Sequence, residues 1–157
     1  MTKLSATEKG YVGELFTVFY LNLHGYSAMI VPNRRPYDVA MEHHDRLIKI
    51  QVKTSTYRNH QKKGYNSGYT YSINRRSRIT KNNKVFHYYE NYNEYDCDIF
   101  AFVQPRLYKI AFFHTQQLDI KFRKILHPHQ FEEYPIEKAL EYMDIKKGPK
   151  PLNLVFH

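Results

Sequence analysis

The chain has 157 residues, enough for one domain spanning residues 1–157 with its own hydrophobic core. Its 24 Lys and Arg residues outnumber its 15 Asp and Glu residues, and the net charge of +9 favours an anionic partner, nucleic acid first. No apolar run approaches the roughly 20 residues of a membrane-spanning helix, and no signal-peptide core follows the first residues. We therefore expect a soluble, cytoplasmic protein with no membrane partner.

The single cysteine, Cys97, cannot form an internal disulfide or a multi-cysteine zinc site. The neighbouring carboxylates of Asp96 and Asp98 disfavour a thiolate, so we expect a buried structural cysteine rather than a nucleophile. The histidines at positions 43–44 and 127–129 form two short clusters, and each has fewer than the three or four ligands of a zinc site. We expect surface histidines and no zinc.

The first predicted element is a helix over residues 6–24. Ser5 and Glu8 have the spacing of a capping box at its N-terminus. Gly10 and Gly13 each cost roughly 1 kcal/mol relative to alanine, so they indicate close approach of the helix backbone to a sheet or to DNA. Apolar residues recur at helical spacing and predict the face that packs on a sheet: Val12, Leu15, Phe16, Phe19 and Leu23.

A strand is expected next, from Tyr26 to Val31. A turn-rich basic loop over residues 32–36 follows it and leads to Asp38. Arg34 and Arg35 in this loop are candidates for phosphate contacts, with ordinary surface charge as the alternative.

Two alternating segments, Tyr37–Val39 and Ile48–Thr54, predict adjacent strands with one buried face. The polar connection over residues 42–46 is short enough for a hairpin, so the strands should be antiparallel. In the second segment apolar and polar side chains fall on opposite faces. The apolar set is Ile48, Ile50 and Val52, and the polar set is Lys49, Gln51 and Lys53.

This arrangement predicts that three polar groups meet. Gln51 and Lys53 project from one side of their strand, and Asp38 lies on the neighbouring strand. A carboxylate and an amide oxygen suit Mg²⁺, which polarises phosphates and generates hydroxide, while a lysine orients water or offsets negative charge. The alternative is a solvated strand, because a half-polar strand is ordinary in antiparallel sheets.

The spacing of Gly13-Glu14, Asp38 and Gln51-x-Lys53 resembles the PD-(D/E)XK nuclease superfamily. Gln51 stands where the superfamily usually has its second carboxylate, and the proline is displaced by one position, in Pro36-Tyr37-Asp38. Among its members the chain most resembles the homing endonucleases of this type that bacterial group I introns encode. The resemblance spans residues 8–54.

The resemblance implies an α/β, restriction-endonuclease-like core, with a mixed β-sheet flanked by helices. It also implies roles for the catalytic residues. Asp38 would hold Mg²⁺ with the Val52 carbonyl and Glu14, Gln51 would be a neutral ligand or position a water, and Lys53 would orient the nucleophile. Without the motif, Glu14 reads as a solvated helix glutamate.

Residues 55–84 carry much of the positive charge and are the predicted DNA-contacting surface. A two-stranded ribbon in this segment could enter the major groove. A flexible solvated loop is the alternative. The candidate contacts are Arg58, Lys62, Lys63, Tyr65, Arg75, Arg76, Arg78, Lys81 and Lys84.

The C-terminal part predicts buried strands over residues 95–103 and 107–113 and a short helix over residues 135–143. We expect an irregular tail from Lys146 onward.

The leading hypothesis is a Mg²⁺-dependent, site-specific endonuclease that cuts both strands of DNA. Cutting both strands requires two active sites, so we expect a homodimer or homotetramer. A restriction enzyme or a Holliday-junction resolvase would use the same residues. The replacement at Gln51 leaves a catalytically inactive DNA-binding module as a further alternative, and an RNA-binding protein is disfavoured by the lack of a known RNA-binding motif.

Overall fold

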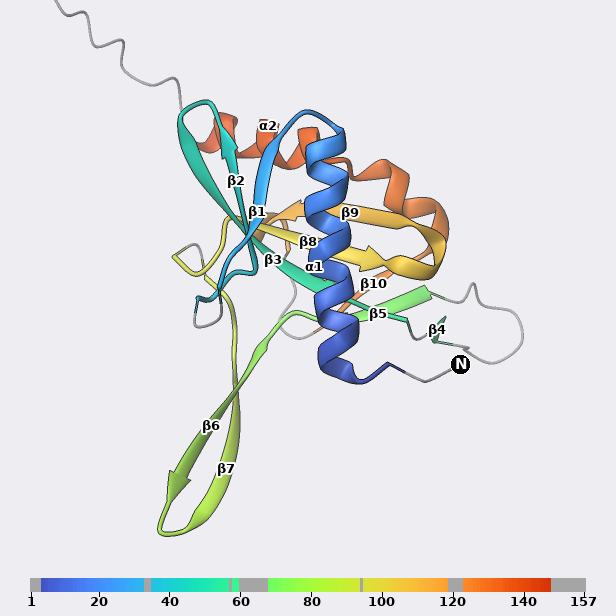
Figure 1. Ribbon diagram of the computed structural model, residues 1–157. Helices are drawn as coiled ribbons and strands as arrows, with labels where there is room; N and C mark the ends of the chain where they lie inside the picture. Colours follow the sequence, from blue (N-terminus) through green and yellow to red (C-terminus); the bar gives the residue numbers. More distant parts are fainter. Residues whose placement is uncertain are drawn as a thin grey trace, which may run out of the picture.

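The computed structural model describes residues 4–32, 35–56, 58–59, 68–93, 95–118 and 123–147, with the backbone alone at 58–59, 76–78 and 145–147 (Figure 1). Its central element is a five-stranded sheet in the order β1-β2-β3-β8-β9. Strands β3 and β8 are parallel, and the other neighbours are antiparallel, so the sheet is mixed. The strands are β1 (Ser27–Ile30), β2 (Val39–His43), β3 (Arg46–Thr54), β8 (Ile99–Gln104) and β9 (Lys109–His114).

Two helices pack with this sheet: α1 (Ala6–Leu23) and α2 (Ile136–Lys147). Both belong to one hydrophobic cluster with the sheet, to which α1 contributes Leu21 and α2 contributes Ala139 and Met143. This confirms the expected α/β architecture of a mixed sheet flanked by helices. The second helix extends four residues beyond the predicted end at Met143, so residues 146–147 are helical rather than part of an irregular tail.

The start of α1 was predicted correctly, and its buried face was predicted only in part, since Phe16 is partly buried and packs against the core. Ser5 N–H donates to Glu8 Oε2 at 2.7 Å, and Glu8 N–H donates to Ser5 Oγ at 3.2 Å, which completes the capping box. The fully buried positions of the helix are Gly13, Thr17 and Leu21, whereas Leu15, Phe19 and Leu23 are exposed.

The physical reason is the close contact between α1 and β3. A Cβ atom added at Gly13 would lie 1.8 Å from Thr54 Oγ1 at the end of β3. Only a small residue allows this approach, so the small residues define the contact face. The bulky apolar residues on the far side of the helix remain in solvent. Gly10 has nothing within 4 Å of an added Cβ, so the close approach predicted for both glycines occurs at Gly13 and not at Gly10.

The other face of the central sheet carries Phe100, Phe102 and Phe113. It packs against a three-stranded sheet in the order β10-β5-β4. Three short 3₁₀ helices complete the described elements. The bounds are β4 (Arg58–Asn59), β5 (Gly68–Ser72), β10 (Arg123–Leu126), η1 (Pro105–Leu107), η2 (Thr115–Gln117) and η3 (Pro128–Glu133).

This second sheet corrects the predicted DNA-contacting surface. Tyr69 and Tyr71 of β5 are buried in the core beneath the central sheet. The segment 55–84 is therefore not one continuous surface, because its middle is interior. Strand β10 was absent from the sequence prediction altogether.

A long two-stranded hairpin projects from the body of the molecule (Figure 1). It consists of β6 (Arg75–Lys81) and β7 (Lys84–Glu90). The two turn residues, Asn82 and Asn83, have φ values of 51° and 56°. Positive φ at both central residues is the requirement of a type I′ hairpin turn, and asparagine tolerates it well.

Two further expectations have mixed outcomes. Strand β8 begins at Ile99 rather than at Tyr95, and Tyr95 is exposed in the preceding turn. Cys97 is buried, as predicted, and burial raises the pKa of its thiol to about 12. Among the helices of the described ranges, none is long and apolar enough to cross a membrane.

Candidate active site

Asp38 lies immediately before β2 and is held by the backbone of its neighbours. Its N–H donates to the Ile50 carbonyl at 3.0 Å, and its own carbonyl accepts from Val31 N–H at 2.9 Å. Its carboxylate Oδ2 accepts from Val52 N–H at 2.8 Å and from the Gln51 side-chain amide. The β2–β3 pairing, with Val39 opposite Ile50, sets this position.

Gln51 is buried on β3, and its amide group sits between two oxygens. Gln51 Nε2 donates to Asp38 Oδ2 and to the Val52 carbonyl, the latter at 3.2 Å. A carboxylate and a backbone carbonyl that converge on one positively polarised group form the oxygen set that hard divalent cations prefer. These residues therefore fit a divalent cation, with the Gln51 N–H group marking where the two oxygens point.

Lys53 lies two residues farther along β3 and is held by Tyr92. Its Nζ donates to the Tyr92 hydroxyl at 3.3 Å and lies 4.7 Å from the centre of the Tyr92 ring. Burial lowers the pKa of Lys53, and the charge of Asp38 opposes that shift. The ring of Tyr92 packs edge-on against Phe100 at 5.3 Å.

Sequence reasoning did not identify Tyr92. The residue follows β7 and is far from the motif in the chain, so no local pattern links it to Lys53. In the folded protein, burial raises the pKa of the Tyr92 hydroxyl, as expected for a phenol inside the protein.

Glu14 reaches the same neighbourhood from α1. Burial raises the pKa of its carboxyl group, and the charge of Asp38 raises it further. The pKa of Asp38 is also raised by burial, while the Val52 N–H and the charge of Lys53 lower it. Two carboxyl groups that share one buried region favour the neutral form of each, and a bound cation would relieve this repulsion.

The family model of the PD-(D/E)XK endonucleases matches residues 5–137. The chain belongs to the PD-(D/E)XK endonuclease family. Nucleases of this family generally use divalent metal ions, and their substrate is DNA.

One solved structure supports the fold. "The structure of a bacterial homing endonuclease: I-Ssp6803I" aligns with a TM-score of 0.67 and 17% sequence identity, covering 93% of this chain and 100% of that one. The likeness confirms the expected restriction-endonuclease-like fold. No match was found among the curated proteins.

Within this nuclease fold, the basic candidates have different surroundings. Arg35 is exposed in the turn that leads to Asp38, and Lys81 and Lys84 are exposed at the hairpin tip. Arg75, in contrast, is paired with two carboxylates of the protein itself. Its guanidinium donates to Glu90 at 2.8 Å and to Asp96 at 3.2 Å.

The remaining DNA candidates have no described side chains. Arg34, Lys62, Lys63 and Tyr65 lie outside the described residues, and the side chains of Arg58, Arg76 and Arg78 do as well. Strand β7 was not predicted from the sequence, and it brings further exposed aromatic residues to the hairpin: Phe86, Tyr88 and Tyr89. The turn signal Asn82-Asn83 between two alternating segments could have revealed this strand.

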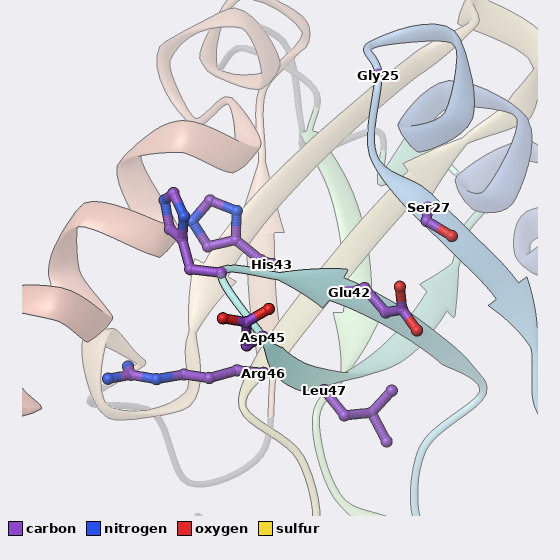
Figure 2. Close-up of a pocket in the computed structure, with 8 residues that line it drawn as sticks. Gly25, Ser27, Glu42, His43, Asp45, Arg46 and Leu47 are labelled. Carbon is purple, nitrogen blue, oxygen red and sulfur yellow. The ribbon is translucent and has the colours of Figure 1, made fainter. Parts of the chain in front are cut away.

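A pocket of about 720 Å³ lies elsewhere, around the β2–β3 turn (Figure 2). Its lining includes Glu42, His43, His44 and Arg46. Asp38 precedes the opposite end of β2, so this pocket is separate from the candidate active site. In the part of the chain that is described, no group of three or more His, Cys, Asp or Glu side chains could hold a metal ion.

Proposed function

We propose that this nuclease is a Mg²⁺-dependent homing-type endonuclease that cuts both strands of DNA at a long, specific site. One observation carries the proposal: the Asp38 carboxylate and the Val52 carbonyl converge on the Gln51 amide, with the Lys53 ammonium beside them. Phosphodiester hydrolysis needs a cation site next to a group that handles a proton or negative charge, and this arrangement supplies both.

Asp38, the Val52 carbonyl and Glu14 would hold the Mg²⁺ ion. When bound, the ion would polarise the scissile phosphate and acidify a water molecule. Gln51 would turn its amide oxygen toward the same point, or hold a water there through its N–H groups. Because glutamine carries no charge, this site has one negative charge fewer than the usual family site and should bind the ion more weakly.

Lys53 would orient the attacking water or offset the charge that develops on the phosphate. Its burial lowers the pKa of the ammonium, which makes loss of a proton from Nζ easier than in water. The hydrogen bond to the Tyr92 hydroxyl fixes the direction in which Nζ points. Tyr92 is therefore a positioning residue in this proposal.

The projecting hairpin β6–β7 is the proposed DNA-reading element. A two-stranded ribbon fits the major groove, and exposed Lys81 and Lys84 at its tip would contact phosphates. Arg35, exposed beside the site, would contact phosphate near the cut. Arg75 would hold the root of the hairpin rather than the DNA, because its guanidinium is already bonded to Glu90 and Asp96.

Cleavage of both strands would need two copies of the active site, and a two-fold dimer, alone or paired into a tetramer, supplies them. Such an enzyme would work in the bacterial cytoplasm, on the nucleoid. Light scattering with and without DNA tests the assembly, and a monomer under both conditions would contradict it.

The direct test is cleavage of a plasmid library with randomised sites, in Mg²⁺ and separately in Ca²⁺. Wild type is compared with Lys53→Met, which keeps the volume of the buried stem but removes the charge. Lys49→Met is the matched control, because Lys49 lies on the same strand and the same face but donates to the Tyr95 carbonyl. We expect cuts at one long recurring sequence in Mg²⁺ only, lost in Lys53→Met and kept in Lys49→Met.

Other outcomes identify the alternatives. Short recurring sites would indicate a restriction enzyme, and activity restricted to four-way junctions would indicate a resolvase. Duplex binding without cutting of any substrate would indicate an inactive DNA-binding module, and the proposal would then be wrong.

A further inference from the structure

The outer face of α1 carries a continuous apolar stripe in solvent. Tyr11, Leu15, Phe19 and Leu23 are 53%, 46%, 63% and 68% exposed. Their spacing of four residues places them on one side of the helix, opposite the buried Gly13, Thr17 and Leu21. In Figure 1, α1 lies in front of the sheet, and no other drawn element crosses its outer side.

This stripe is also free of positive charge, although the chain as a whole carries +9. Residues 10–33 contain no Lys or Arg, and Glu14 is their only charged residue. A surface without cations is unsuited to phosphate, because DNA-binding surfaces owe their affinity to Lys and Arg. The same lack of cations disfavours an anionic membrane surface, which attracts basic amphipathic helices.

We infer that the outer face of α1 is the surface through which two copies of this chain associate. The choice of a second copy rests on the proposed cleavage of both strands, which requires two active sites. The charge distribution supports it, since two copies that each carry +9 repel one another except where their contact surfaces lack cations. A two-fold contact places the same stripe on both sides, and an uncharged apolar stripe is complementary to itself.

The size of the stripe fits this use. An 18-residue helix is about 27 Å long at 1.5 Å per residue, and the stripe from Tyr11 to Leu23 follows about 18 Å of it. Antiparallel packing of two such helices would bring Leu15 of each protomer toward the partner's Phe19. Aromatic and aliphatic anchors at the centre of a contact usually dominate its energy.

Sedimentation velocity of the full chain at micromolar concentration tests the inference. We expect wild type to be a dimer or a dimer of dimers. Phe19→Glu buries a charge twice in a two-fold contact and should raise the dissociation constant of the dimer at least about tenfold. Leu23→Lys is the second variant, because lysine suits the C-terminal turn of a helix and preserves folding while it charges the stripe.

Leu47→Glu is the matched control. Leu47 is 57% exposed on β3, which it shares with Lys53 rather than with α1, so the dimer should keep its wild-type dissociation constant. Unchanged association in both α1 variants would overturn the inference. A wild type that sediments as a monomer would also overturn it, and co-flotation of that monomer with phosphatidylglycerol vesicles would identify a membrane surface instead.

The same proteins separate this inference from the nuclease proposal. If wild type associates, the α1 variants do not, and none of the proteins cuts DNA in Mg²⁺, then the α1 surface is supported and the nuclease proposal fails. If wild type cuts DNA but sediments as a monomer with and without DNA, then the α1 surface and the proposed assembly fail, and the proposed nuclease activity alone stands.

Discussion

Replacing Gly13 with alanine tests the packing that carries Glu14 to the active site. The added Cβ would lie 1.8 Å from Thr54 Oγ1 and 3.1 Å from Thr54 Cβ, well inside van der Waals contact. Rotation of the Thr54 side chain can relieve the contact with Oγ1 but not the one with Cβ, so α1 must also move away from β3 or the end of β3 must shift. Since Thr54 follows Lys53 directly and Glu14 follows Gly13, both responses displace residues of the proposed site.

The expected change in the free energy of unfolding of Gly13→Ala follows from two opposing effects. Alanine in a helix interior is roughly 1 kcal/mol more favourable than glycine. Overpacking a buried contact costs about 1–3 kcal/mol, and the short distance here places Gly13→Ala toward the upper end. Gly10→Ala is the matched control on the same helix, because nothing lies within 4 Å of its added Cβ. Its free energy of unfolding should therefore rise by the helix preference of alanine alone, roughly 1 kcal/mol.

Urea and thermal unfolding should therefore separate the two variants by about 2–3 kcal/mol, or on the order of 4–12 °C in Tm for a domain of this size. Cleavage should fall in Gly13→Ala and stay unchanged in Gly10→Ala. In Gly13→Ala, the second substitution Thr54→Ala should restore part of the lost stability, because it removes the Oγ1 atom that the added Cβ meets. Its removal breaks no hydrogen bond among the described residues. Equal stability of Gly13→Ala and Gly10→Ala would refute the reasoning.

Three further predictions concern the site, the core and the hairpin. Gln51→Glu should tighten Mg²⁺ binding in calorimetric titration, because it adds a negative charge beside Asp38, and an unchanged affinity would contradict the assigned role. The Cys97 thiol should react with a maleimide at pH 8 only after unfolding, because its pKa of about 12 and its burial keep it protonated and inaccessible. Rapid labelling of the folded protein would disprove this. Lys81→Ala should lower the salt dependence of DNA binding by about 0.9 in log–log slope, the value of one phosphate contact, and an unchanged slope would remove Lys81 from the interface.

The parts that the sequence predicted correctly depend on local pattern. The capping box at Ser5 and Glu8 involves residues three apart, and the alternation of β3 has a period of two. Once β2 and β3 pair as neighbours, their register brings Asp38 to Gln51 and Val52, so the central contacts of the candidate site were within reach of sequence reasoning.

The parts that failed depend on partners distant in the chain. Leu15, Phe19 and Leu23 of α1 were assigned to the wrong face, because the contact with Thr54 selects for Gly13 instead of for hydrophobic size. Strand β5 lies within the segment 55–84 that was predicted to contact DNA, yet its tyrosines belong to the core, because β5 pairs with β10 and local pattern does not reveal that pairing. Tyr92 belongs to the same class, since only the fold brings it to Lys53.

The root of the hairpin has a consequence for how such a protein can change over evolutionary time. Arg75 and Glu90 are register partners at its base, so the ribbon leaves the body and returns to it at a single point. Its length and sequence can vary without altering the pairing of β3 with β2 and β8. Residues that would select a DNA target can thus diverge while those that would cut it stay fixed, and exchanging residues 76–89 between relatives is the corresponding route to new targets.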